Sequence, residues 1–236
     1  MSAADTGAWP ELWGELPPVF ATVFDPARPW DLLGAPLDEA LAGLPEQRIE
    51  IALDPRVHLA GDRVAIGAGT RIAPGVLIEG PVHIGRDCEI RTGAYLRGGC
   101  WLEDGCVVGA NVEVKRAIFL AGARAPHLTY VGDSILGRRV NLGAGTVLSN
   151  FRHDGGEIAI PLGDGRRLPT GRRKLGALLG DGVATGCNSV LSPGTVVGAR
   201  TQLYTGVQLR SGIWPADSIV KLRQALDVVP HARRNR

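Results

Sequence analysis

The sequence contains no apolar run that approaches the ~18 residues of a membrane-spanning helix. Its first residues, M-S-A-A-D-T-G-A-W, lack the basic and apolar regions of a secretory signal peptide. Cysteine is scarce, with 4 residues and no C-x-x-C pair. These absences argue against a membrane partner, structural disulfides and a zinc site, and they predict a cytoplasmic location by default.

An excess of charge is missing too, because 26 basic and 24 acidic residues leave a net charge of +2. This balance argues against a nucleic-acid partner, and the basic C-terminal segment H-A-R-R-N-R is too short to change it. Lysine is rare, occurring only at Lys115, Lys174 and Lys221. A chain of 236 residues with 44% apolar content is consistent with one modest domain that has its own core.

What the sequence does have is an aliphatic residue at every sixth position from Ile66 to Leu120. The row reads Ile66, Ile72, Ile78, Ile84, Ile90, Leu96, Leu102, Val108, Val114 and Leu120. The pattern returns at Leu136, Leu142 and Leu148, and again at Leu179, Thr185, Leu191, Val197 and Leu203. The position four residues after each aliphatic is small or branched up to Ile118, and it includes Cys88, Cys100 and Cys106. These three cysteines are therefore expected to be buried thiols.

A period of six is a multiple of the two-residue period of a strand, so both restricted positions point to the same side. A helix with 3.6 residues per turn would distribute them around its circumference. A unit this short cannot bury its own apolar face and has to stack on its neighbours. The repeat therefore predicts an all-β solenoid.

Hexads such as I-G-A-G-T-R at Ile66 and L-G-A-G-T-V at Leu142 resemble the hexapeptide acyltransferases. That resemblance implies a left-handed parallel β-helix with three hexads per triangular coil. Eighteen hexad starts then give about six coils.

Four segments lie outside or interrupt the repeat. Residues 1–50 are expected to be a lead-in that packs on the solenoid, with a short helix at Leu37–Leu44. The β-helix is expected to span residues 51–213, with a hairpin extruded at about 152–173. Residues 214–236 are predicted to form a capping helix from Ala216, begun by Asp217 or Ser218, and a basic tail. A fourth irregularity is the sixteen-residue step from Leu120 to Leu136, which predicts a register break.

His127 and Tyr130 lie in this predicted break, and chemistry tends to be placed on loops of rigid scaffolds. A lone histidine is more often a structural residue. The surrounding segments V-E-V-K-R-A, A-P-H-L-T-Y-V-G-D, V-N-L-G-A-G-T and S-N-F change this balance. They resemble the acetyltransferase domain of the bacterial bifunctional enzyme that acetylates glucosamine-1-phosphate and then uridylylates it. The match runs from about Arg97 to Asn150 and resumes at Lys174.

The resemblance implies an acetyl-CoA-dependent N-acetyltransferase of an amino-sugar 1-phosphate, in nucleotide-sugar or cell-envelope precursor synthesis. It implies His127 as general base and Asn150 as a further catalytic residue. The residues implied to hold the sugar phosphate or complete the site are Arg97, Lys115, Tyr130, Asn141 and Lys174. Acetyl-CoA is implied to lie in a groove between solenoids of a homotrimer, near Ala144, Cys187 and Thr205. No metal is implied.

The chemistry is consistent with these residue types. A neutral imidazole suits removal of a proton from an attacking amine near neutral pH. Either a backbone N–H at a solenoid corner or the amide of Asn150 would stabilise the developing oxyanion. Arg97 and Lys115, eighteen residues apart, are expected to be stacked cations that supply charge for a phosphate. Stacked cations repel unless an anion lies between or beside them, so in the empty site removal of either is expected to leave heat stability unchanged or slightly higher.

The sequence also departs from the family pattern. Cys187 stands where the family has a serine, Phe151 replaces a tyrosine, and the hairpin before Lys174 is an insertion. The glycine-rich loop of the uridylyltransferase half is missing, whereas P-W-D-L-L-G-A resembles the linker before the β-helix of some two-domain sugar nucleotidyltransferases. The expectation is a free-standing acetyltransferase-like domain.

Two other classes of protein can share such a repeat. The γ-class carbonic anhydrases share the β-helix but bind zinc through histidines, two of them five residues apart, and the five histidines here include no such pair. A non-catalytic trimeric scaffold or regulatory domain remains open, since the solenoid alone suffices for assembly.

Overall fold

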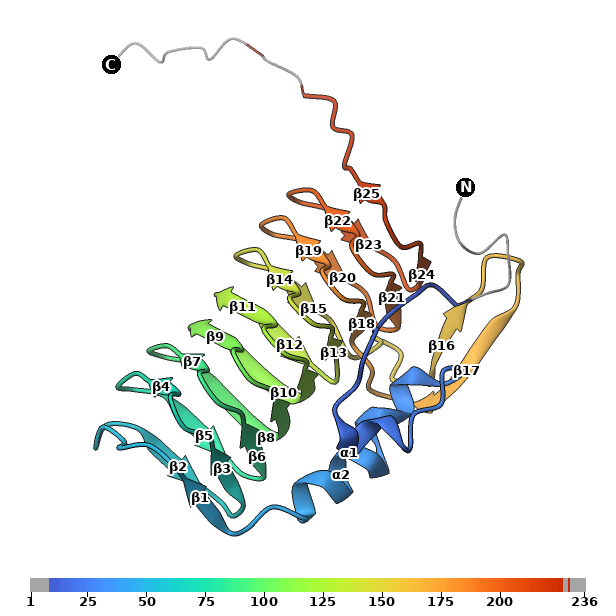
Figure 1. Ribbon diagram of the computed structural model, residues 1–236. Helices are drawn as coiled ribbons and strands as arrows, with labels where there is room; N and C mark the ends of the chain where they lie inside the picture. The colour runs from blue at the N-terminus through green and yellow to red at the C-terminus, as the bar shows by residue number, and fades with distance from the viewer. Residues whose placement is uncertain (1–8, 227–228, 230–236) are drawn as a thin grey trace, which may run out of the picture.

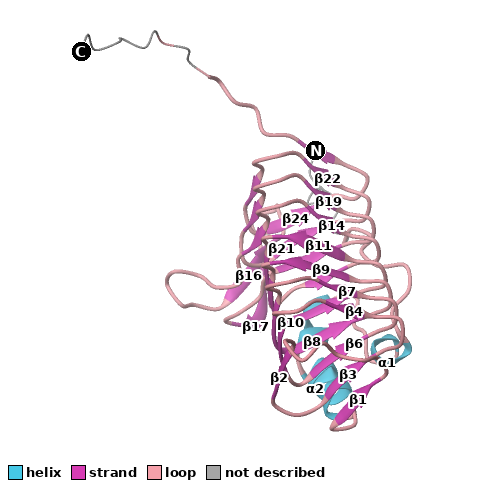
Figure 2. Cartoon of the chain, turned by 90° about the vertical axis from the view of Figure 1, so that its left-hand side faces the viewer, coloured by secondary structure: helices cyan, strands magenta, loops and turns pink. Residues whose placement is uncertain are grey.

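The computed structural model describes residues 9–226 and residue 229. Parallel strands wind into a β-solenoid of about 10 turns, which rise one above another in Figures 1 and 2. One sheet contains β1 (Gln47–Ile49), β2 (His58–Ala60), β3 (Val64–Ile66), β5 (Leu77–Glu79), β6 (Val82–Ile84), β8 (Tyr95–Leu102), β10 (Glu113–Phe119), β12 (Tyr130–Gly132), β13 (Ile135–Leu136), β15 (Val147–Leu148), β18 (Ala177–Leu179), β20 (Val190–Leu191), β21 (Thr195–Val197), β23 (Gln208–Leu209) and β24 (Gly212–Trp214).

The second sheet covers another side of the solenoid and is also parallel throughout. It contains β4 (Arg71–Ile72), β7 (Glu89–Ile90), β9 (Val107–Ala110), β11 (Arg124–His127), β14 (Asn141–Leu142), β19 (Ala184–Thr185), β22 (Gln202–Leu203) and β25 (Ile219–Val220). The repeat thus correctly predicted an all-β solenoid, but the expected six coils are too few. Turns that are not eighteen residues long break the six-residue period and are missed when hexads are counted. Examples are the turns in which Gln47 pairs with Val64 and Ile135 pairs with Leu178.

The interior of the solenoid is filled by the aliphatic and small residues of the repeat. Cys88, Cys100 and Cys106 are buried there as expected, and all four cysteines are free. Burial raises the pKa of the Cys100 thiol to about 12, so this thiol is unreactive at neutral pH.

The predicted register break between Leu120 and Leu136 is misplaced. The irregularity is a bulge at Arg116, which has φ of 45°: Lys115 pairs with Arg97, whereas Ala117 pairs with Cys100. Because one residue of β10 replaces two glycines of β8, Phe119 rather than Leu120 occupies the interior row, and Leu120 packs under the lead-in. β11 is regular beyond the bulge, and His127 pairs with Ala110.

The lead-in forms a second core against one side of the solenoid. It contains α1 (Pro18–Ala21), η2 (Pro29–Leu33) and α2 (Ala35–Ala42), and α2 corresponds to the predicted short helix. Phe20, Trp30 and Leu37 are fully buried in this core. In Figure 1 the helices lie on the side of the solenoid where the hairpin projects.

The hairpin pairs β16 (Ile158–Pro161) antiparallel with β17 (Arg167–Arg172), where the sequence predicted one. Its β17 strand contacts the lead-in, since Trp30 Nε1 donates to the Thr170 carbonyl at 3.1 Å and Arg172 Nη2 donates to the Leu33 carbonyl at 3.1 Å. Ile158 and Ile160 complete the second core.

The predicted capping helix from Ala216 is wrong. Residues 216–226 contain no helix, and β25 continues the second sheet by pairing with β22. Asp217 has φ of 54°, which a right-handed helix does not allow, and its carboxylate pairs with Arg200 instead of capping a helix. Hydrogen bonds such as Tyr204 N–H to the Val220 carbonyl, at 2.9 Å, favour one more strand over a helix. Among the described residues, no helix has the length and hydropathy of a membrane span.

Candidate functional site

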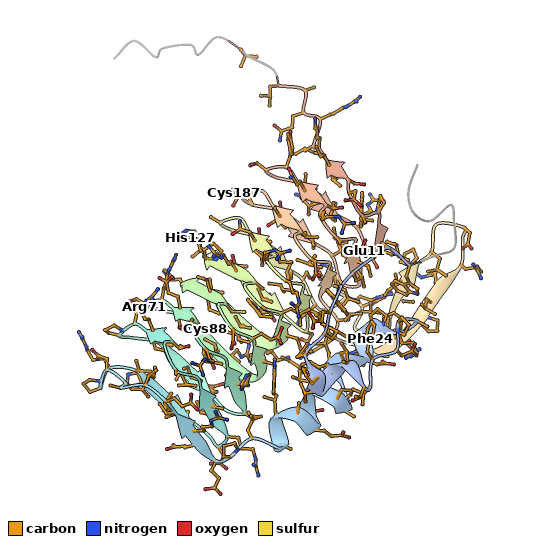
Figure 3. The ribbon with its side chains drawn as sticks, viewed as in Figure 1. Glu11, Phe24, Arg71, Cys88, His127 and Cys187 are labelled. Atoms are coloured by element: carbon orange, nitrogen blue, oxygen red, sulfur yellow. The ribbon has the colours of Figure 1, made fainter. Side chains whose placement is uncertain are left out.

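One corner of the solenoid collects four of the residues singled out from the sequence. The strands on both sides of this corner pair in register, so each corner residue lies above its equivalent in the preceding turn. In ascending order these residues are His127, Ala144, Cys187 and Thr205. Figure 3 shows His127 and Cys187 along the same edge. We call these four positions the corner column.

The corner column is open to solvent. His127, Cys187 and Thr205 are exposed and Ala144 is half-buried. Backbone hydrogen bonds connect the column from turn to turn; for example, the Asn188 N–H donates to the Ala144 carbonyl at 2.8 Å. A Cβ added to Gly186 would lie 2.3 Å from the backbone nitrogen of Thr205, so glycine is required for this close approach. The column is a narrow, rigid strip that a long flexible ligand can follow.

A polar cluster lies on the strands that follow this corner. Lys115 pairs with Arg97 across β10 and β8, as expected for stacked positions. Each cation has a carboxylate partner: Arg97 Nη1 lies 2.7 Å from Glu113 Oε1, and Lys115 Nζ lies 3.4 Å from Asp133 Oδ2. The expectation of mutually repelling cations is therefore wrong, because two carboxylates neutralise the pair.

Asp133 is the centre of this cluster, although the sequence did not single it out. Its side chain is only 2% exposed, and its φ of 46° turns the chain directly after β12. Besides Lys115, its Oδ2 accepts a hydrogen bond from Asn150 Nδ2 at 2.6 Å. A buried carboxylate requires such partners, and here it joins two of the predicted site residues. We call Lys115, Tyr130, Asp133 and Asn150 the Asp133 cluster.

Tyr130 is the fourth member of the cluster. Asn150 Nδ2 donates to the Tyr130 hydroxyl at 3.1 Å. A Cβ on Gly132 would lie 2.4 Å from that hydroxyl and 2.7 Å from Asn150 Nδ2, so the glycine makes room for this contact. Burial, followed by the charges of Asp133 and Glu113, raises the pKa of Tyr130. The hydroxyl is therefore protonated at neutral pH and retains its own O–H as a donor.

The orientation of the Asn150 amide follows from these contacts. An ionised carboxylate only accepts hydrogen bonds, so the NH₂ group rather than the carbonyl oxygen of Asn150 has to face Asp133. Both N–H groups are then engaged, one by Asp133 and one by Tyr130. The amide oxygen Oδ1 points away from the Asp133 carboxylate as a hydrogen-bond acceptor.

Lys174 adjoins the cluster through the backbone, whereas Asn141 does not. An isolated bridge pairs Lys174 with Phe151, and the Leu175 N–H donates to the Asn150 carbonyl at 3.0 Å. The hairpin thus returns the chain to the side of Asn150, and Lys174 is exposed there. Asn141 is exposed on β14, before the corner, and makes no side-chain hydrogen bond to the cluster within the described residues.

Residues 9–226 and 229 contain no group of three or more His, Cys, Asp or Glu side chains able to hold a metal ion.

Residues 81–116 match the protein family described as Bacterial transferase hexapeptide (six repeats). The chain carries this hexapeptide repeat. A bifunctional sugar-1-phosphate nucleotidylyltransferase/acetyltransferase of Sulfurisphaera tokodaii is 39% identical over 149 residues, which cover 56% of this chain and 37% of that protein.

Two proteins named Bifunctional protein GlmU are also similar to the hexapeptide-repeat chain. That of Aromatoleum aromaticum is 33% identical over 219 residues, covering 90% of this chain and 44% of that protein. That of Synechococcus sp. strain CC9605 is 33% identical over 191 residues, covering 75% of this chain and 38% of that protein. The chain spans less than half of the length of each of these relatives.

Proposed function

We propose that the protein is an acetyl-CoA-dependent N-acetyltransferase that acts on an amino-sugar 1-phosphate such as glucosamine-1-phosphate. The observation that carries this proposal is a linked cluster beside the corner that presents His127: Lys115 and Asn150 contact the buried Asp133, and Asn150 also contacts Tyr130. The name of the Sulfurisphaera tokodaii relative, which combines sugar-1-phosphate and acetyltransferase activities, supports the same reaction.

His127 is assigned as the general base. An amine attacks a thioester only as the free base, and a neutral imidazole can take the proton that the amine loses as the new C–N bond forms. The imidazole projects from the exposed end of β11, at the foot of the corner column. The tetrahedral intermediate collapses as its C–S bond breaks, the leaving thiolate of coenzyme A takes that proton from the His127 imidazolium, and the N-acetyl sugar phosphate is released.

Asn150 is assigned to hold the amine rather than the oxyanion. Because Asp133 and Tyr130 engage both of its N–H groups, only Oδ1 remains, and this oxygen accepts a hydrogen bond from the attacking amine. A backbone N–H at the solenoid corner then stabilises the oxyanion of the tetrahedral intermediate.

The phosphate is assigned to Arg97, Lys115 and Lys174. Arginine has five N–H donors and lysine three, so both retain donors beyond the contacts with Glu113 and Asp133. The carboxylates hold the two cations in place before the phosphate binds, and Lys174 adds a positive charge next to Asn150. Asn141, on the other side of the corner, is assigned to complete the site.

A thiol-release assay tests the proposed reaction. Acetyl-CoA and glucosamine-1-phosphate are expected to yield free coenzyme A in proportion to the enzyme, measured with a thiol reagent. A protein-only blank is needed, because Cys187 is itself exposed. The alternative, a non-catalytic scaffold or regulatory domain, predicts no thiol release above an acceptor-free control across a panel of amino-sugar phosphates.

Acetyl-CoA is expected to protect Cys187 from alkylation. This thiol is the exposed one of the four, and it lies in the corner column where the pantetheine chain is proposed to run. Iodoacetamide should modify one thiol per native chain, and saturating acetyl-CoA should slow that modification severalfold, as followed by mass spectrometry. Cys187→Ser should remain unmodified. A labelling rate independent of acetyl-CoA would remove the corner column from the proposal.

The protein is expected to be a homotrimer. Leu128, Val147 and Phe151 are exposed apolar residues near the site, with 64%, 36% and 43% of their surface accessible in the single chain. Three solenoids packed around an axis would cover such side chains and form the groove for coenzyme A. Light scattering at micromolar concentration should give the mass of three chains, and a stable monomer would contradict a site shared between chains.

A further inference from the structure

A cavity lies on the side of the solenoid that carries the lead-in, at the end of the fold opposite the C-terminal strands. Its volume is about 280 Å³. Leu44 and Pro45, which follow α2, form one wall, and the first turns of the solenoid form the other. The residues of those turns that matter below are Arg48, Ala65, His83 and Trp101. None of the residues assigned to the acetyltransferase site lines this cavity.

One row of residues on the solenoid surface changes from aliphatic to aromatic side chains at this cavity. Ala65, His83, Trp101 and Ile118 occupy the same position in successive turns. From Ile118 upward the row is aliphatic and is covered by the lead-in. Below it, His83 stacks on Trp101 with ring centroids 4.0 Å apart and an interplanar angle of 28°. Phe20 contacts the edge of Trp101, so the stack is held from above.

The stack carries polar atoms that the protein does not satisfy. His83 Nδ1 and Trp101 Nε1 are two of three buried side-chain nitrogen or oxygen atoms without a partner among the described residues. Both of these nitrogens are buried, whereas the ring of His83 lines the cavity. Burial lowers the pKa of His83 to about 4, and the ring is therefore a neutral stacking surface at pH 7.

The rim of the cavity offers both hydrogen-bond donors and acceptors. Arg48 and Arg86 supply guanidinium groups, and Glu50 and Asp104 supply carboxylates. Each carboxylate also holds the backbone of a turn: Glu50 accepts from the Ala68 N–H and Asp104 accepts from the Arg86 N–H. The rim has no net charge, so it favours a ligand edge with mixed donors and acceptors over a simple anion.

We infer that this cavity is a binding site for a nucleobase-like heteroaromatic ring. The ring stacks on His83, continuing the aromatic pair, and its edge bonds to the guanidinium of Arg86. Unpaired bases are recognised in this way, by stacking on aromatic or guanidinium planes and by hydrogen bonds to their edges. This inference is independent of the acetyltransferase proposal.

Calorimetric titration with uridine 5′-monophosphate and with adenosine 5′-monophosphate tests the site, with ribose 5-phosphate as the control that lacks a base. We expect at least one nucleotide to bind with a sub-millimolar Kd, to alter tryptophan fluorescence and to bind without competition from ribose 5-phosphate. His83→Ala should weaken binding about tenfold or more. Arg86→Ala, at an exposed position, should weaken it severalfold without affecting the fold.

His58→Ala is the matched control, because His58 is an exposed histidine on β2 that does not line the cavity. This variant should bind the nucleotide as the wild type does. No binding of either nucleotide at millimolar concentration would overturn the inference. Equal affinity of ribose 5-phosphate would show a phosphate site instead. Unchanged affinity in both folded variants, His83→Ala and Arg86→Ala, would place the nucleotide elsewhere and equally overturn it.

Discussion

His127→Ala is expected to lower kcat for acetyl transfer to glucosamine-1-phosphate by ~10²-fold or more, with a much smaller change in KM. A positioned general base contributes about two to four orders of magnitude to proton transfer in the transition state, and alanine leaves only solvent to take the proton. The fold should be unaffected, because His127 is exposed and β11 pairs through its backbone. Steady-state kinetics and thermal unfolding of the same preparation measure both effects.

His58→Ala controls for the loss of an exposed histidine from a strand, since β2 lies in the first turns, far along the chain from the site. It should retain wild-type kcat. If His127→Ala turns over at the wild-type rate, this histidine is a structural residue of the corner. If KM rises while kcat is unchanged, the imidazole binds substrate and does not remove the proton.

The solenoid was predictable because the same six-residue pattern recurs in turn after turn of the sequence. Strand pairing places equivalent inward positions of successive turns on top of one another, and each of them has to be aliphatic to fill the interior. Ile66, Ile84 and Leu102 stack in this way. The number of turns was not predictable from that repeat. A turn shortened by the bulge at Arg116, or extended by the hairpin, keeps its pairing but loses the period. Backbone hydrogen bonds, not spacing, define such turns.

The C-terminal segment shows a local preference overridden by tertiary structure. The segment A-D-S-I-V-K-L-R-Q-A-L has a helical pattern, yet Ile219 and Val220 add a strand to an edge that β22 leaves open. An unpaired edge is a strong template for one more strand. No property of the segment alone reveals that this edge is adjacent to it.

At the site, the predicted residues and their carboxylate partners differ in how readily the sequence identifies them. The spacing of Lys115, Tyr130 and Asn150 resembles a known family, so these residues were identified from the sequence. Asp133, the carboxylate that Lys115 and Asn150 share, directly follows β12, and only its burial shows its importance. Glu113 was more accessible to prediction, since alternation along β10 places it on the same side as Lys115. Partners of charged groups are set by three-dimensional proximity, which a motif does not encode.

Lys115→Met is expected to lower the free energy of unfolding by about 3 kcal/mol, because it removes the cation next to a buried carboxylate. The Asp133 side chain is 2% exposed and Lys115 is 24% exposed, so solvent screens their interaction only in part. For a chain of this length the loss corresponds to a Tm lower by roughly 6 to 12 °C. The double variant Lys115→Met/Asp133→Asn, which removes both charges, should recover most of that loss.

Arg97→Ala is the matched control, because Arg97 and Glu113 form an exposed pair in the same cluster. Surface pairs contribute little to stability, and its Tm should remain close to that of the wild type. Calorimetry on the wild type, Lys115→Met, Asp133→Asn and the double variant gives the coupling between Lys115 and Asp133. A Tm of Lys115→Met equal to that of the wild type would show that Asp133 does not depend on this cation.

The same variants separate a structural role of the cations from phosphate binding. The wild type is expected to use glucosamine-1-phosphate in strong preference to free glucosamine. A lost charge-assisted contact of ~1.5 to 3 kcal/mol corresponds to roughly ten- to 150-fold lower kcat/KM for the phosphorylated sugar in Lys115→Met and in Arg97→Ala. Because free glucosamine has no phosphate to hold, its use should change little in Arg97→Ala, which keeps the Asp133 cluster intact. If both variants use the two sugars in the wild-type ratio, these cations serve only their carboxylates, and the phosphate is held elsewhere.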